Sequence, residues 1–215
     1  MARGESARMI VWAGSQEDLG YRLLAAGTTE HVIAKSGDLG EVLSLREPAW
    51  SGVAVPPGTG ALRLAENSDG LAKAVGFADT LAFAGGLPGA FGFLSRVAGM
   101  VEAVRQASGQ EYLAGYARVN ATGPEAWAAL AALTQLRVER IESTPDALVG
   151  AVAHRLGITV TPPQHEPTIE FGPTGFRWDG ARASNERVEL YTAGAQIRLL
   201  TSREPDIGAM MAACG

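Results

Sequence analysis

Short apolar segments alternate with helix-like segments at both ends of residues 9–160, and this alternation constrains the fold most strongly. Residues 9–13, 31–35 and 51–55 are short apolar runs, which are typical of buried strands. Helix signals separate these runs, and the same alternation resumes over residues 111–160. Strands that are joined by helices form parallel sheets, because the helix returns the chain to the starting edge. The sequence therefore predicts an α/β fold: a mainly parallel, flavodoxin- or Rossmann-like layered sheet with helices on both faces.

Two helix starts are marked by a small polar or glycine residue followed by proline. Thr122 or Gly123 precedes Pro124, and Thr144 precedes Pro145. Proline is favoured in the first turn of a helix, where its missing N–H has no partner to lose. We therefore expect one helix to begin near residue 123 and a second near residue 145.

The middle of the chain, residues 70–107, is predicted to be an apolar helical insert with a break at Gly85, Gly86, Pro88 and Gly89. Asp79 carries the only charge between residues 74 and 94. The same stretch contains four of the six phenylalanines: Phe77, Phe83, Phe91 and Phe93. A pair of core helices is the favoured interpretation. The alternative is a surface patch that contacts another subunit or lines a ligand pocket, and a membrane span is unlikely because of the central break.

The last fifty residues have a different pattern. Thr168–Phe171 and Gly175–Trp178 indicate one antiparallel hairpin, and Glu186–Tyr191 and Ala195–Thr201 indicate a second. Residues 205–213 are predicted to form a short final helix. These patterns predict an α/β domain over residues 1–161, which includes the helical insert, and a β-rich C-terminal extension over residues 162–215.

Composition excludes several classes of protein. The chain has 215 residues, of which 47% are apolar and 19% charged, so it can form a sizeable core. A net charge of −5 without a basic cluster argues against nucleic-acid binding. Cys214 is the single cysteine, which rules out an internal disulfide, and no metal-ligand motif is present. The N-terminal residues do not resemble a signal peptide, so we expect a cytoplasmic protein.

Glycine-rich stretches do not match the common nucleotide-binding motifs. The turn at residues 56–60 follows a predicted strand, but Ala61 and Leu62 stand where a P-loop needs lysine and a hydroxyl residue. Gly86, Gly89 and Gly92 are spaced every third residue, which differs from the dinucleotide fingerprint. We therefore predict no cofactor.

Polar residues follow the first two predicted strands, where α/β sheets commonly bind ligands. They are Ser15, Glu17, Asp18, Lys35 and Asp38. Their carboxylate and amino groups suit acid–base chemistry. Ser15 and Asp18 also suit a helix cap, which is the simpler interpretation.

The sequence shows no catalytic constellation, and the leading functional hypothesis is a binding, regulatory or accessory protein. It would act through protein–protein contacts, with a homo-oligomer or a protein partner bound through residues 74–94. The alternative is a small-molecule transferase or hydrolase with its site at the carboxyl ends of the parallel strands.

Overall fold

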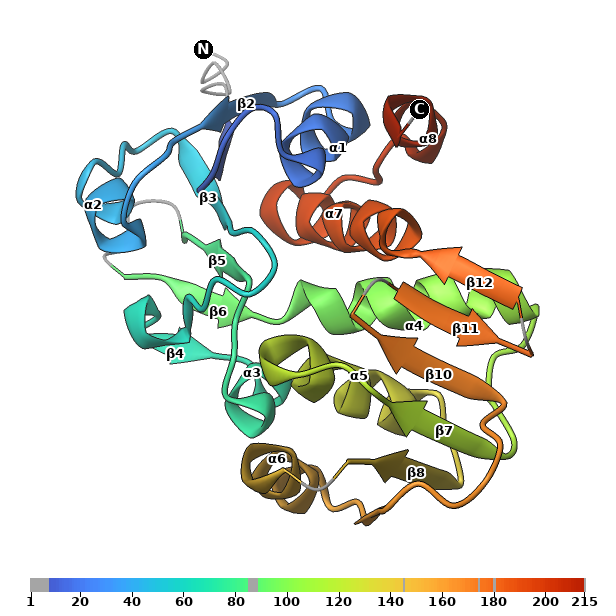
Figure 1. Cartoon of the computed structure of the whole chain (residues 1–215). Helices are drawn as coiled ribbons and strands as arrows, with labels where there is room; N and C mark the ends of the chain where they lie inside the picture. Colours follow the sequence, from blue (N-terminus) through green and yellow to red (C-terminus); the bar gives the residue numbers. More distant parts are fainter. Residues whose placement is uncertain (1–7, 85–88, 145, 174, 180, 215) are drawn as a thin grey trace.

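The computed structural model describes residues 8–84, 89–144, 146–173, 175–179 and 181–214, except for the side chains of residues 181–183. The described residues form two mixed sheets with helices packed between and around them, and helix α4 (Ser95–Ser108) leads from the first sheet to the second (Figure 1). The predicted α/β class is confirmed.

The first sheet comes from the N-terminal part of the chain and has the strand order β2-β1-β3-β5-β6-β4. Its strands are β1 (Met9–Trp12), β2 (His31–Ala34), β3 (Trp50–Ala54), β4 (Asn67–Ser68), β5 (Thr80–Ala82) and β6 (Phe91–Phe93). Strands β1, β2 and β3 are parallel, as their helical connections require, whereas β5 runs antiparallel to both β3 and β6.

Both faces of the first sheet are covered, which explains why β1 is apolar at every position. Ile10 and Trp12 face helices α1 (Leu19–Gly27) and α7 (Asn185–Thr201). Val11 faces the opposite way, toward α2 (Leu39–Ser44). A strand with two buried faces gains free energy from every apolar side chain, so no polar alternation is expected.

The second sheet has the strand order β12-β11-β10-β7-β8-β9. Its strands are β7 (Tyr116–Val119), β8 (Arg140–Ser143), β9 (Val160–Thr161), β10 (Ile169–Gly172), β11 (Gly175–Trp178) and β12 (Ala181–Ser184). Read from β9, this is the 3-2-1-4-5-6 order of a Rossmann sheet. Strand β11 departs from that pattern because it runs antiparallel to both of its neighbours, β10 and β12.

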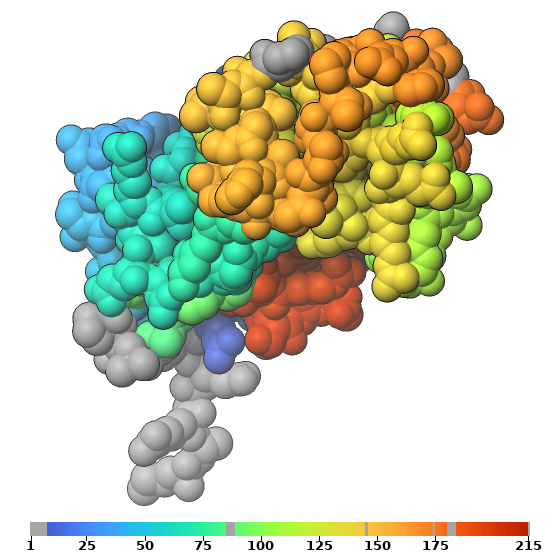
Figure 2. Space-filling model, turned by 90° about the horizontal axis from the view of Figure 1, so that it is seen from below, coloured from blue at the N-terminus to red at the C-terminus, as the bar shows by residue number. Residues whose placement is uncertain are grey.

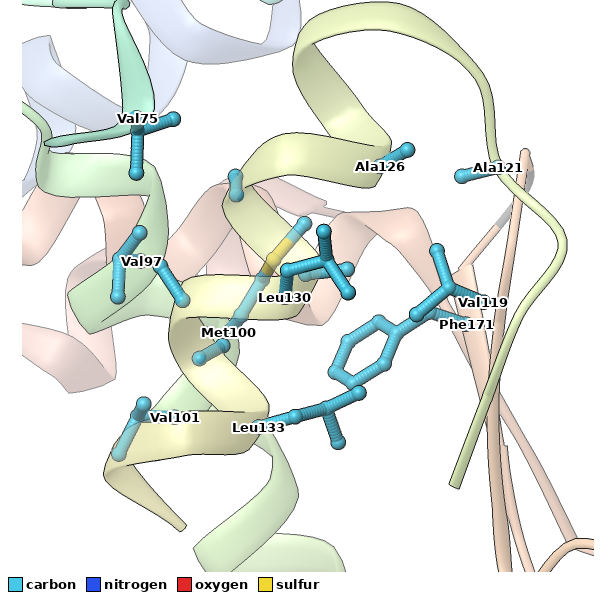
Figure 3. Packing of buried hydrophobic residues seen from close by; sticks show 14 of the residues in the cluster. Val75, Val97, Met100, Val101, Val119, Ala121, Ala126, Leu130, Leu133 and Phe171 are labelled. Carbon is cyan, nitrogen blue, oxygen red and sulfur yellow. The ribbon is translucent and has the colours of Figure 1, made fainter. Parts of the chain in front are cut away.

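One face of the second sheet forms the largest core of the protein. Val119 and Phe171 pack against Leu130 and Leu133 of α5 (Gly123–Gln135), and Met100 of α4 lies beside them (Figure 3). Helix α6 (Ala147–Leu156) contributes to the same cluster. The charged residues of β7, β8 and β10 alternate with these apolar residues and therefore lie on the opposite face.

The two sheets also meet through a short helix, α3 (Gly70–Val75), which contacts α6. The Arg155 guanidinium group at the end of α6 donates hydrogen bonds to the backbone carbonyl oxygens of Ala74 (2.6 Å) and Val75 (3.3 Å). In the space-filling view, residues near 70 pack directly against the later α6 segment (Figure 2). A cation at the carboxyl end of a helix also complements the helix dipole.

The C-terminal end of the chain returns to the first sheet. Helix α7 lies against α4 and α1, and α8 (Ile207–Cys214) packs on α1, so the predicted final helix is confirmed (Figure 1). The predicted second hairpin is wrong, because residues 185–201 form α7. Val188, Thr192 and Gln196 are buried at helical spacing, and Gly194 lies inside the helix against Pro205. The first hairpin is confirmed as β10 and β11.

The predicted helical insert at residues 70–107 is wrong in its centre. Strands β5 and β6 lie within it, although helices α3 and α4 occupy its two ends. Apolar runs of this length have no decisive period, and pairing with β3 selected the strand form. Gly85, Gly86 and Pro88 of the predicted break lie outside the described residues.

The two predicted helix starts differ in outcome. Thr122 is the N-cap of α5, and Pro124 lies in its first turn. The predicted cap at Thr144 is wrong, because Asp146 caps α6 by accepting hydrogen bonds from the backbone N–H groups of Leu148 (2.8 Å) and Val149 (3.0 Å). Pro145 lies outside the described residues.

The predicted division at residue 161 stays a prediction. Residue 161 falls inside the second sheet, since β9 and β10 lie on either side of it. The strands of the first sheet lie within residues 9–93, and those of the second sheet lie within residues 116–184.

Replacement of Gly99 by alanine should destabilise the protein, because α4 and α7 touch at this position. A Cβ atom on Gly99 would lie 2.1 Å from Thr192 Oγ1 and 2.7 Å from the Thr192 backbone nitrogen. We expect a loss of about 1–3 kcal/mol in the free energy of unfolding, measured by urea denaturation. Gly150→Ala is the matched control, because Gly150 lies in helix α6 and a Cβ atom there would meet no atom of another part of the protein within 4 Å. That variant should gain about 0.5–1 kcal/mol, and equal effects in both variants would contradict the packing.

Candidate functional site

A small hollow lies where the two sheets meet, between the first turns of α4 and α5 and the middle of α7. The residues after β1 and β3 also line it, so it lies at the carboxyl ends of these parallel strands. Its free volume is about 20 Å³. A water molecule needs roughly 10–15 Å³ of such space, so the hollow has room for one or two.

Asp79 forms the floor of the hollow and is 4% exposed. Its Oδ1 atom accepts hydrogen bonds from the Ser95 N–H and the Thr80 hydroxyl, both at 2.8 Å, and Oδ2 accepts one from the Arg96 N–H at 2.6 Å. Burial raises the pKa of Asp79 above its ordinary value, although these hydrogen bonds favour the carboxylate. The side chain thereby fixes the N-terminus of α4 to the first sheet.

The Arg96 side chain joins three helices and is buried. Its Nε and Nη2 atoms donate to the two carboxylate oxygens of Glu125 at 3.1 and 2.7 Å, and Nη1 donates to Glu189 Oε1 at 2.7 Å. Burial alone lowers the pKa of Arg96, but the two carboxylates raise it by more. The pKa of Arg96 therefore lies above its ordinary value, and the guanidinium stays charged. Burial raises the pKa of Glu189. Four titratable groups from distant segments therefore meet at one point.

Further polar and aromatic side chains complete the lining. Gln196 of α7 is 2% exposed, and its amide nitrogen donates a long hydrogen bond of 3.4 Å to the Asp79 carbonyl oxygen. The Thr192 hydroxyl donates to the Val188 carbonyl oxygen at 2.7 Å. The aromatic rings of Trp12 and Phe77 provide the apolar lining.

The candidate ligand residues predicted after the first two strands mainly shape their own turns. Asp18 Oδ2 accepts hydrogen bonds from the Ser15 N–H at 2.9 Å and from Trp12 Nε1 at 2.8 Å. Asp18 is the N-cap position of α1, so the predicted cap at Ser15 is wrong; instead, the Ser15 hydroxyl accepts from the Glu17 N–H. Asp38 caps α2 through the Gly40 N–H.

Glu17, Lys35 and Asp38 do not line the hollow. Asp18 comes nearest to it, because it holds the indole of Trp12. A ligand role for this group of residues stays a prediction.

The four phenylalanines predicted as an interface have different environments. Phe77 is buried, and Phe83 stacks under the Arg46 guanidinium with 4.0 Å between that group and the ring centroid. Phe91 is 37% exposed and contacts Phe93 with 4.9 Å between ring centroids. Their role as an interface stays a prediction. No helix in the described part of the chain has the length and apolar character needed to cross a membrane.

A second charged cluster lies on the face of the second sheet opposite the core. Glu142 of β8 is buried, and its Oε1 atom lies 2.5 Å from His165 Nδ1. The imidazole stacks on Tyr116 with 4.1 Å between ring centroids. Burial alone would raise the pKa of Glu142, but hydrogen bonds from His165 and from the backbone of Gln164 and His165 lower it to about 2. Among the described residues, no group of His, Cys, Asp and Glu suits a metal ion.

Comparison with known proteins identifies the fold. No family model and no curated protein matches the sequence. Shikimate dehydrogenase from Mycobacterium tuberculosis has a TM-score of 0.76 and 18% identity over 96% of this chain and 97% of that one. The enzyme from Thermus thermophilus, solved with NADP(H) and shikimate, gives 0.74 and 19% over 96% and 98%. Quinate dehydrogenase from Corynebacterium glutamicum, solved with NAD, gives 0.73 and 14% over 95% and 96%. The fold is like that of shikimate dehydrogenase, which joins a substrate domain to a Rossmann NAD(P) domain.

The turn at which a Rossmann sheet binds a dinucleotide does not fit that cofactor here. Such turns carry the pattern G-x-G-x-x-G, whose backbone N–H groups contact the pyrophosphate. The corresponding turn from β7 to α5, Asn120–Pro124, contains one glycine. Pro124 lacks an N–H group, and Glu125 places a carboxylate in the first helical turn. Both changes disfavour a bound phosphate.

One residue of this site is conspicuous in the sequence. Asp79 is the single charge within residues 74–94, and a buried charge needs partners. Its partner Arg96 is the first cation after this stretch and lies in the first turn of α4. Glu125 and Glu189 carry no sequence signal, because helices commonly expose glutamate.

Removal of the Arg96 guanidinium should strongly destabilise the fold. Arg96→Met would leave Glu125, Glu189 and Asp79 without a cation in a buried place, and we expect a loss of about 3–5 kcal/mol in unfolding free energy. Arg198→Met removes an exposed pair with Glu204 and should cost less than about 1 kcal/mol. Chemical denaturation of both variants measures the difference, and similar losses would show that the buried cluster is not structural.

The low pKa of Glu142 predicts an acid-dependent stability. Because the folded-state pKa of about 2 lies below the ordinary glutamate value of 4.5, the ionised group stabilises the fold above pH 4.5. This contribution is lost as the pH falls from 4.5 toward 2. In urea titrations over this range, Glu142→Gln should show a weaker pH dependence than the wild type. An unchanged slope would contradict the assigned pairing with His165.

Proposed function

We propose that this protein binds a small polar molecule in the hollow between its two sheets, using a scaffold like that of shikimate dehydrogenase. The carrying observation is the convergence of Asp79, Arg96, Glu125 and Glu189 at that hollow. Asp79 directly precedes β5 of the first sheet, and the other three residues come from three different helices. Buried titratable groups with shifted pKa values concentrate at ligand and catalytic sites, because burying them costs folding free energy.

The position of the hollow supports this proposal. It lies between the units built around the two sheets, at the carboxyl ends of β1 and β3 and beside the first turn of α5. Ligands of α/β proteins commonly bind at such places. The alternative of a transferase or hydrolase at the strand ends uses the same location, and Asp79 and Glu189 are its candidates for proton transfer.

An oxidoreductase function is suggested by the fold, which covers nearly the whole chain in each comparison. The turn from β7 to α5 opposes it, because one glycine, a proline and a glutamate replace the phosphate-binding pattern. We therefore favour ligand binding without a nicotinamide dinucleotide.

A role in protein–protein contacts is the remaining proposal. Its support is the exposed edge of Phe91, which lies on β6 beside Phe93. The buried charge cluster has no part in that role. A variant of Glu189 should therefore lose affinity for a small ligand under the first proposal and keep its protein contacts under the second.

Binding of a small molecule should be visible in a thermal-shift screen of polar metabolites, followed by calorimetry of the best ligands. We expect a ligand that raises the melting temperature of the wild type and has reduced affinity for Glu189→Gln. NADPH should produce no change in intrinsic tryptophan fluorescence and no heat. Tight NADPH binding would favour an oxidoreductase, and the absence of any ligand in the screen would contradict the proposal.

A further inference from the structure

We infer that the hollow is selective for a cationic head group, such as a primary ammonium, and rejects carboxylates. This inference rests on the proposed function, because it names the chemical class of the ligand that the hollow takes. Its basis is the charge balance of the lining, the supply of hydrogen-bond acceptors, the aromatic walls and the small volume.

The charge balance of the lining is unfavourable for an anion. Arg96 is its one positively charged side chain among the described residues, against the carboxyl groups of Asp79, Glu125 and Glu189. With all three acids ionised, the site carries a net charge of −2. It becomes positive only if all three are protonated. With two or three of the acids ionised, a buried carboxylate ligand therefore meets like charge, and the low local dielectric strengthens the repulsion.

The positive groups near the hollow already have partners. The Arg96 guanidinium binds both Glu125 oxygens and Glu189 Oε1. The backbone N–H groups of Ser95 and Arg96 at the start of α4 donate to Asp79. Asp79 thus occupies the N-terminus of α4, and α5 has Pro124 and the Glu125 carboxylate in its first turn, so neither terminus offers the usual anion site.

Hydrogen-bond acceptors remain available. The amide of Gln196 is almost fully buried and lines the hollow, and its described hydrogen bond uses the nitrogen. No described residue donates to its Oε1 atom. Glu189 binds Arg96 through Oε1, which leaves Oε2 for another donor. An ammonium group has three N–H donors and no acceptor, so it matches this arrangement.

The walls and the volume of the hollow fit the same head group. Trp12 and Phe77 line it, and aromatic faces attract cations by about 0.5–2 kcal/mol. The hollow has room for one or two waters, which is enough for an ammonium group. The rest of a larger ligand must lie outside the hollow, at its opening between the sheets. The fold is thus shared with enzymes of shikimate and quinate, whereas the charge of the hollow favours the opposite kind of ligand.

The test compares ligands of one shape and different charge. Cyclohexylamine, cyclohexanol, cyclohexanecarboxylate and shikimate are titrated into the full chain at pH 7, and the indole N–H signal of Trp12 is followed by NMR. We expect cyclohexylammonium to bind at least tenfold more tightly than either carboxylate, with cyclohexanol between them.

Two variants locate the effect. Glu189→Gln should weaken cyclohexylammonium binding about tenfold and should reduce the ratio of the affinities for cyclohexylammonium and cyclohexanecarboxylate. Glu125→Gln should also weaken cyclohexylammonium binding and lower this ratio. Glu166→Gln is the matched control, because this glutamate is 88% exposed and lies outside the lining. It should leave every affinity unchanged.

The outcomes separate the two levels of the argument. Tighter binding of a carboxylate, or equal binding of amine and carboxylate, overturns the charge selectivity and leaves ligand binding in the hollow intact. Failure of all four probes, together with binding of another molecule found by the screen, also overturns the selectivity alone. Failure of the probes and of the screen overturns the proposed function itself.

Discussion

The two-sheet structure depends on the hydrogen bonds and ion pairs that Arg96 makes with three acids. The backbone N–H of Arg96 donates to Asp79, which directly precedes β5 of the first sheet, while the Arg96 side chain binds Glu125 at the start of α5 and Glu189 on α7. One residue therefore connects the N-terminal sheet, the Rossmann-like sheet and the returning C-terminal helix. A buried ion pair gains little stability over apolar packing, but removal of one partner is costly. Such a group is therefore better explained by specificity or ligand binding than by stability.

This arrangement also determines the chemistry of the hollow. Because three acids surround one cation, the site can accept a proton or a cation but has little attraction for an anion. The first turns of α4 and α5 would otherwise supply free N–H groups and partial positive charge. Asp79 accepts hydrogen bonds from the first N–H groups of α4, Glu125 places a carboxylate in the first turn of α5, and Pro124 removes one donor there. The protein thus combines a dehydrogenase-like fold with a hollow lined by three acids and one cation, and fold alone does not determine function.

Local signals in the sequence predicted much of the fold. The α/β class, the parallel strands at residues 9–54, the start of α5 at Thr122 and the hairpin of β10 and β11 follow from apolar runs and turn residues. The errors arose where tertiary packing decides. Residues 185–201 alternate well enough for a hairpin, but burial against α4 and α1 selects a helix. Residues 80–82 become a strand because they pair with the edge of β3, and residues 91–93 pair in turn with residues 80–82.

The site was less predictable, because its residues lie far apart in the sequence. Asp79 could be singled out as a lone charge, whereas Glu125 and Glu189 resemble ordinary surface residues of helices. The most direct test of the account is a crystal structure of the protein soaked with cyclohexylamine. We predict density for the ammonium group within hydrogen-bonding distance of Glu189 Oε2 and Gln196 Oε1, with the Arg96 pairs intact. A ligand bound only at another surface, with the hollow unchanged, would contradict it.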